Sequence, residues 1–194
     1  MSEPARHAAI LAGGASSRMG EPKAAIELLG RPLIGHAIDA TRQAGLEPLV
    51  VAKRDTGLPA IDCALLLEPG EPLHPAVGVI AALERVGGPV VVLPCDAPLV
   101  PPALIAELAG RPVDFLMPVH PREQPLIARY APALLPRLRE GVDAGDSMHA
   151  IAADLGGERM GADELATFGD PERMFINAND PAEIERLRTE LSEG

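Results

Sequence analysis

The chain has 194 residues, and 28 acidic against 17 basic side chains give it a formal net charge of −11. This balance argues against a nucleic-acid binder and against a protein that binds anionic membranes, because both need a basic surface. No apolar run approaches the roughly 18 residues of a membrane span, and no signal peptide is recognisable. We therefore expect a cytoplasmic protein that forms one domain over residues 1–194.

Two residue types are scarce, and both bear on function. The two cysteines, Cys63 and Cys95, are too few for a disulfide framework or a Cys-rich zinc site. Cys95 has no histidine partner indicated by the sequence, so we expect a small buried apolar residue there and not a nucleophile. Among the 17 basic residues only Lys23 and Lys53 are lysines, which suggests a specific reason for each.

Short apolar runs alternate with helical patterns, which is typical of an α/β protein with a mostly parallel sheet. In the first part of the chain we expect strands over 8–12, 48–52, 63–67 and 89–94. Helices are predicted over 32–44, 75–86 and 102–109. Further along we expect strands over 113–119, 126–130 and 174–178, and helices over 131–140, 146–155 and from Pro181 onward.

A glycine-rich segment follows the first predicted strand. Gly13 and Gly14 let backbone N–H groups approach a ligand closely, and successive N–H groups form a concavity that binds anions. Arg18 and Lys23 add positive charge, so phosphate is the expected ligand. The segment matches neither the Walker A pattern nor the dinucleotide-binding glycine pattern. A tight turn with exposed cations is the alternative interpretation.

Asp96 lies where the strongest predicted strand ends. Ligands of open α/β sheets bind at the carboxyl ends of strands, and a carboxylate near a triphosphate is a suitable magnesium ligand. The alternative is an aspartate that caps the helix beginning near Pro101.

Asn177 and Asn179 alternate along the end of the last predicted strand, so both could point to one side and meet polar edges of a ligand. Turn and capping chemistry explains part of this pattern. The histidines show no metal-binding spacing.

The segment LAGGASSRMGEPK, residues 11–23, resembles the N-terminal signature of the molybdenum cofactor nucleotidyltransferases. Other segments resemble that family in the same order along nearly the whole chain: 31–39, 71–83, 94–102, 124–130 and 175–184. The resemblance implies a three-layer, Rossmann-like nucleotidyltransferase fold with a mostly parallel central sheet. Its nucleotide half would span about 1–110, and its acceptor half about 111–194.

The resemblance also implies an activity: transfer of GMP from GTP to molybdopterin, with Mg²⁺ and release of pyrophosphate. The Gly13–Gly14 pair and the segment from Pro75 to Gly78 favour GTP over CTP. Molybdopterin and GTP would be small-molecule substrates. Transient contact with proteins of molybdopterin synthesis or molybdoenzyme maturation is expected as well.

Site residues follow from the same resemblance. The catalytic residues would be Lys23, Arg18 and Asp96, with Asp96 also the metal ligand. The nucleotide-binding residues would be Leu11, Ala12, Gly13, Gly14, Arg18, Lys23, Glu68, Gly78 and Asp96. Glu68 is an approximate counterpart of an aspartate in the family. The acceptor would be bound by Asn177 and Asn179.

The chain departs from the family pattern at several positions. Pro22 stands where many members have an acidic residue, and Asp146, Ser147 and Met148 replace a basic cluster. These departures leave two alternatives open. The first is a cytidylyltransferase, or a related nucleotidyltransferase with another phosphorylated acceptor. The second is a non-catalytic nucleotide-binding subunit, which has less need of Arg18, Lys23 and Asp96 together.

Overall fold

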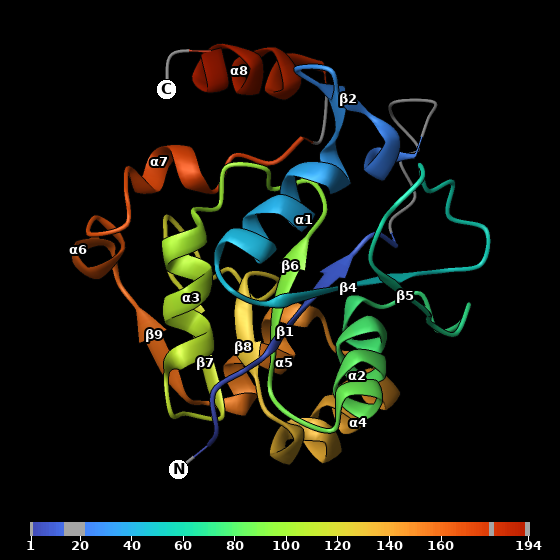
Figure 1. The fold of residues 1–194 in the computed structure, drawn as a ribbon. Coiled ribbons are helices and arrows are strands. Elements are labelled where there is room, and N and C mark those ends of the chain that lie inside the picture. The colour runs from blue at the N-terminus through green and yellow to red at the C-terminus, as the bar shows by residue number, and fades with distance from the viewer. Residues whose placement is uncertain (1, 14–21, 179–180, 193–194) are drawn as a thin grey trace.

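The computed structural model describes residues 2–13, 22–178 and 181–192. Its centre is a seven-stranded sheet with the order β5-β4-β1-β6-β8-β7-β9 (Figure 1). The strands are β1 (His7–Leu11), β4 (Glu47–Ala52), β5 (Ala64–Leu67), β6 (Val90–Pro94), β7 (Phe115–Pro118), β8 (Ala128–Tyr130) and β9 (Glu158–Met160). Only β8 runs antiparallel to its neighbours in this sheet. The expected mostly parallel sheet is thus confirmed.

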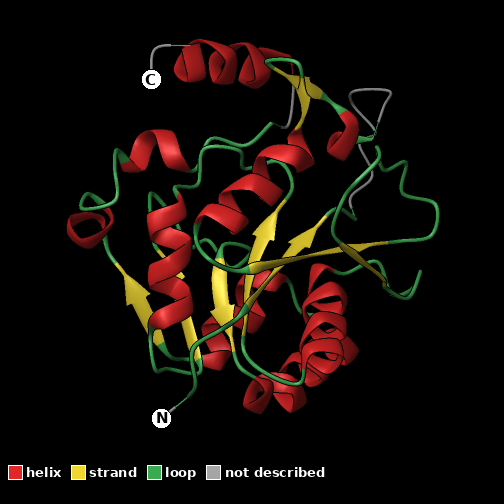
Figure 2. Ribbon diagram, in the orientation of Figure 1, coloured by secondary structure: helices red, strands yellow, loops and turns green. Residues whose placement is uncertain are grey.

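Helices cover both faces of the sheet (Figure 2). One face packs against α1 (Leu33–Gln43) and α3 (Pro102–Gly110), and the other against α2 (Pro75–Val86), α4 (Leu135–Ala144) and α5 (Met148–Leu155). Side chains alternate between the faces along each strand: Ala9 of β1 joins the cluster under α2, and Ile10 joins the one under α1. The three-layer arrangement predicted from the sequence is therefore present.

The ends of α2 lie at the predicted residues for local reasons. His74 precedes the helix, and its Nδ1 accepts a hydrogen bond from the backbone N–H of Ala76 at 3.1 Å. Pro75 occupies the first turn, where a missing N–H costs nothing. Gly87 ends the helix in the left-handed region, with φ of 69°.

Short elements complete the described chain: η1 (Lys23–Ala25), β2 (Glu27–Leu28), β3 (Arg31–Pro32), η2 (Pro132–Leu134), α6 (Ala162–Leu165), α7 (Pro171–Met174) and α8 (Pro181–Ser192). The β2–β3 hairpin packs against α8, where Leu28 and Leu187 share a buried cluster (Figure 1). Within the residues that the structure describes, no helix is long and apolar enough to span a membrane.

The predicted strand over 174–178 is wrong. Met174 ends α7, Phe175 follows in a turn, and 176–178 has no regular structure. Two of its backbone N–H groups form hydrogen bonds that do not belong to a sheet. The N–H of Ile176 donates to the Arg173 carbonyl at 3.1 Å, and the N–H of Ala178 donates to the Asp96 carbonyl at 2.8 Å. Ile176 and Ala178 are nevertheless buried, so an irregular segment shows the alternating burial of a strand.

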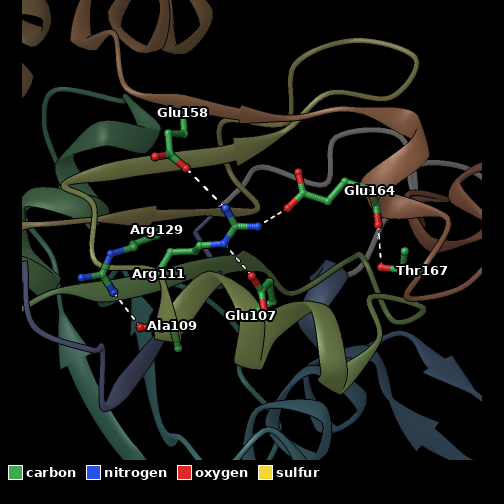
Figure 3. A network of polar contacts seen from close by, with 7 residues as sticks. All are labelled: Glu107, Ala109, Arg111, Arg129, Glu158, Glu164 and Thr167. Atoms are coloured by element: carbon green, nitrogen blue, oxygen red, sulfur yellow. Dashed lines mark hydrogen bonds and ion pairs between the residues drawn. The ribbon is translucent and has the colours of Figure 1, made fainter.

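A pair of arginines holds the sheet edge to neighbouring segments (Figure 3). Arg111 follows α3 and pairs with three carboxylates, those of Glu107, Glu158 and Glu164. Since these come from α3, β9 and α6, one guanidinium joins three elements. Arg129 of β8 is fully buried, and its Nη1 donates to the Ala109 carbonyl at 2.8 Å, near the end of α3.

Candidate active site

Four residues follow the carboxyl ends of four neighbouring parallel strands. Glu68 follows β5, Lys53 follows β4, Gly13 lies beyond β1, and Asp96 lies beyond β6. They form a row along one edge of the sheet in that order. In the sheet, β1 has β4 on one side and β6 on the other, so the strand order changes direction at β1. Open α/β sheets bind their ligands at the carboxyl ends of the strands beside such a change of direction.

A buried apolar cluster lies beneath this edge, and several of its small members adjoin site residues. These small members are Ala12, Ala24, Ala52 and Cys95, and each of them is at most 5% exposed. Each is the sequence neighbour of a site residue: Ala12 of Gly13, Ala24 of Lys23, Ala52 of Lys53, and Cys95 of Asp96. Cys95 is 5% exposed, which confirms its expected place as a buried apolar residue, and this burial raises the pKa of its thiol to about 12.

Lys23 and Asp96 come together from elements 73 residues apart. Lys23 Nζ lies 2.8 Å from Asp96 Oδ2, and the two side chains are 23% and 15% exposed. The backbone N–H of Ala178 reaches the Asp96 carbonyl, so the 176–178 segment lies beside the pair. Gly14, Arg18 and Asn179 lie outside the described residues.

Glu68 lies between two glycines. A Cβ atom added to Gly13 would come 2.6 Å from Glu68 Oε1, and one added to Gly78 would come 2.7 Å from Oε2. Both positions must therefore lack a side chain for the carboxylate to lie there. Burial raises the pKa of this carboxyl, and the charge of Lys53 partly opposes the increase. Burial of Glu68 therefore makes the charged form of its carboxyl group less favourable than it is in water.

This cost predicts a pH-dependent effect of the substitution Glu68→Gln. Because the folded pKa is raised, the wild type loses stability relative to the variant as pH rises above about 4.3, the usual pKa of a free glutamate. We expect Glu68→Gln to melt at a higher temperature than the wild type at pH 7, and the difference to shrink toward pH 4. Melting curves of both proteins across this range, without nucleotide, test it; equal melting temperatures at pH 7 would contradict it.

Pro22 contacts the crossover between β4 and β5. A Cβ atom on Gly57 would lie 2.5 Å from Cγ of the Pro22 ring. Pro22 immediately precedes Lys23 in the sequence. We expect Gly57→Ala to displace Pro22 and Lys23 and to lower kcat about tenfold or more, since an error of about 1 Å in a positioned group can cost roughly 10²-fold. Gly110→Ala is the matched control, because nothing lies within 4 Å of the added atom. Equal kcat values for the two variants would exclude this positioning role.

Asn177 presents a buried acceptor atom. Its Oδ1 is shielded from solvent and has no hydrogen-bond partner in the described part of the chain. An unsatisfied buried acceptor costs about 1–3 kcal/mol, so a ligand that donates to it would remove a penalty. The paired projection of Asn177 and Asn179 from a strand end does not hold, because 176–178 is not a strand.

Comparisons with known proteins identify the family. The family model described as the MobA-like NTP transferase domain matches residues 8–159. The chain belongs to this family. A relative from Shewanella amazonensis named molybdenum cofactor guanylyltransferase is 30% identical over 96% of this chain and 97% of its own length. One from Shewanella sp. strain MR-4, with the same name, is 31% identical over 96% of each chain.

A solved structure supports the fold. Molybdopterin-guanine dinucleotide biosynthesis protein A from Archaeoglobus fulgidus aligns with a TM-score of 0.81, covering 97% of this chain and all of that chain at 23% identity. Membership of the MobA-like NTP transferase family makes the protein a nucleotidyltransferase, and the names of its relatives connect it with molybdenum cofactor biosynthesis.

Lys53 is the residue at this edge that the sequence prediction left out. The sequence did offer a clue to Lys53, because it is one of only two lysines in the chain. The prediction assigned a role only to Lys23, because Lys23 lies in the recognisable signature.

Proposed function

We propose that this MobA-like nucleotidyltransferase transfers GMP from GTP to the phosphate of molybdopterin and releases pyrophosphate. The observation that supports this most is the Lys23–Asp96 pair at the carboxyl edge of β1 and β6, which brings a cation and a carboxylate to the place expected for a triphosphate. The names of the Shewanella relatives favour GTP and molybdopterin among the substrates of this enzyme class.

The reaction needs little covalent chemistry from the protein. The acceptor phosphate is already anionic, so no general base is required, and positioning with charge stabilisation is sufficient. The new bond joins an acceptor oxygen to the α-phosphorus, while the bond from the α-phosphorus to the bridging oxygen breaks. The electron pair leaves with pyrophosphate. In this proposal Lys23 and Arg18 neutralise the charge that develops there, and the backbone of Leu11, Ala12, Gly13 and Gly14 contacts the nucleotide.

Asp96 suits the proposed Mg²⁺. No group of three or more His, Cys, Asp or Glu side chains within the described residues could hold a metal by itself. Mg²⁺ usually needs only one or two carboxylates, because waters and substrate phosphates complete its shell, so one mostly buried aspartate fits. When bound, the ion would supply positive charge beside the phosphates. Asp96 would hold it, and Lys23 would contribute a second positive charge beside the phosphates.

Product analysis tests the proposal. The protein is incubated with Mg²⁺ and molybdopterin, with GTP or CTP in separate reactions, and the products are examined by mass spectrometry. Molybdopterin guanine dinucleotide from GTP alone is the expected result. Product from CTP alone would instead identify a cytidylyltransferase.

A different phosphorylated acceptor is the second candidate, favoured by the segment that replaces the family's basic cluster. Ser147 caps α5, with its Oγ accepting from the backbone N–H of Ala150 at 3.2 Å, and Asp146 is exposed. Neither supplies positive charge to an acceptor phosphate. GTP binding without product from molybdopterin would support this candidate. Cytoplasmic location and contact with proteins of cofactor maturation stay predictions.

A further inference from the structure

The two edges of the seven-stranded sheet differ in their chemistry. β9 forms one edge, and two of its three residues, Glu158 and Arg159, are charged and form ion pairs with other elements. β5 forms the other edge, and its sequence, ALLL, contains no charged residue (Figure 1). Edge strands usually carry charges that discourage pairing with a strand of another chain. β9 has this protection, and β5 lacks it.

One face of β5 is both apolar and exposed. Leu65 and Leu67 are 49% and 46% exposed, and they are two of the four large hydrophobic side chains that are exposed within the described residues. Leu66, between them, points to the other face and packs against the cluster under α2. The exposed leucines therefore lie side by side on one face of an unprotected edge strand.

The backbone groups of the same two leucines point outward. Glu68, directly after β5, donates its N–H to the Ala52 carbonyl of β4 at 2.9 Å. Backbone groups alternate in direction along a strand, so those of Leu66 also face β4, and those of Leu65 and Leu67 face away from it. Within the described residues, no backbone hydrogen bond joins these outward groups to another segment. Each of the two leucines therefore offers a donor and an acceptor to a further strand.

We propose that β5 pairs with β5 of a second copy of this chain in antiparallel orientation, about a two-fold axis at Leu66. Leu65 of each copy then lies opposite Leu67 of the other, each pair exchanges two backbone hydrogen bonds, and the leucine side chains meet on one face. A register shifted by one residue would set Leu65 opposite Leu66, whose backbone groups face β4, so the hydrogen bonds could not form.

The edge complements itself, which favours a second copy over an unrelated partner. A two-fold contact requires a surface that matches its own image, and the two leucines exchange places about the axis. The flanking charges match as well, because Asp62 and Gly70 lie four residues to either side of Leu66 and the pairing brings them together. Asp62 pairs with Arg42 of its own chain, yet its side chain is 78% exposed. It would approach Lys53 of the second copy, whose Nζ donates to the Gly70 carbonyl at 2.8 Å.

The lack of charge on β5 also suits association of this chain with itself. Two molecules that each have a net charge of −11 repel one another, and an uncharged strand brings no like charges directly opposite. Stable interfaces bury about 800 Å² per partner, and a contact centred on a four-residue strand buries less, so we expect a dimer that dissociates in the micromolar range. The antiparallel pairing directs the carboxyl ends of the two sheets to opposite sides, so each candidate active site stays open.

Sedimentation velocity of the full chain tests the association. The wild type is expected to change from monomer to dimer between about 1 and 500 µM. The double substitution Leu65→Lys and Leu67→Lys should move this transition to concentrations about tenfold higher or more, because ammonium groups would then lie directly opposite one another. Leu29→Lys is the matched control: Leu29 is 53% exposed but lies between β2 and β3, and its replacement should leave the transition unchanged. Circular dichroism establishes that each variant is folded.

A cysteine at the axis tests the register. Leu66→Cys, in a Cys63→Ser background, places two thiols across a non-hydrogen-bonded pair whose Cα atoms lie about 4.5 Å apart, within reach of a disulfide. Oxidised glutathione should convert this variant into a covalent dimer, seen by non-reducing electrophoresis, and should leave Leu29→Cys in the same background monomeric.

Three results would overturn the proposal. A wild type that stays monomeric at every concentration would leave β5 to a different partner. A dimer that the double lysine substitution does not weaken would lie on another surface. A dimer in which Leu66→Cys forms no cross-link would exclude the antiparallel register about Leu66.

Discussion

Replacing Asp96 by alanine is expected to lower kcat by about 10³-fold or more while GTP still binds. A metal held by this carboxylate contributes several kcal/mol to stabilising charge in the transition state, and each 1.36 kcal/mol corresponds to about tenfold in rate. Lys23→Ala is expected to lower kcat by about 10²–10³-fold, comparable with the loss of one transition-state donor. Pyrophosphate release, followed with GTP and acceptor at saturation, measures both.

The control for this pair is Asp55→Ala, which removes an exposed carboxylate in the turn after β4. It should leave kcat near the wild-type value. Because Lys23 and Asp96 contact each other, the double variant should be less impaired than the product of the two single effects. Full activity of Lys23→Ala would refute its role at the phosphates. Retained turnover in Asp96→Ala would refute the role of Asp96 as the metal ligand.

Replacing Arg129 by methionine is expected to lower the free energy of unfolding by about 3–5 kcal/mol, because several hydrogen bonds from a charged donor, each contributing about 1.5–3 kcal/mol, are lost together. The guanidinium is fully buried and bonds mainly to backbone carbonyls. Nε donates to Val113 at 2.6 Å, Nη1 to Ala109 at 2.8 Å, and Nη2 to Glu3. Methionine fills part of the volume but donates nothing, so these three carbonyls lose the guanidinium as a donor.

Urea unfolding at pH 7 measures the effect of Arg129→Met. Arg85→Met is the comparison, because Arg85 is exposed on α2 and should change stability by no more than about 0.5 kcal/mol. A loss below about 1 kcal/mol for Arg129→Met would contradict this account of the buried arginine.

Much of the sheet and of its helices could be predicted from the sequence where local chemistry and burial agree. The run 89–94 contains adjacent β-branched residues and forms the buried strand β6. The segment 75–86 has Pro75 at its start and Gly87 after its end, and it forms α2 over those same residues. In the site, the sequence indicated both members of the Lys23–Asp96 pair, because each lies directly beside a recognisable motif.

Other features depend on contacts that no local pattern contains. The alternation of apolar and polar residues over 174–178 arises because Ile176 and Ala178 pack against β2 and α8. An irregular segment packed in this way has the same sequence pattern as a strand. Strand β9 is three residues long with an exposed first residue, and it is defined by pairing with β7.

The surroundings of Glu68 also could not be inferred, because they require Gly13 and Gly78, far apart in the sequence, to lie against the same carboxylate. The roles assigned to Gly14, Arg18 and Asn179 stay predictions.

The central place of β1 has a consequence for how the protein forms during synthesis. β1 is made before every other strand, yet it lies between β4 and β6, and its first residue, His7, pairs in register with Glu47 on one side and Val90 on the other. The nascent strand therefore has no partner until β4 is made, and it lacks its second partner until β6, near the middle of the chain, has left the ribosome. Until β6 is made, one edge of β1 lacks its partner, and unpaired strand edges of this kind are prone to aggregation in a newly made chain.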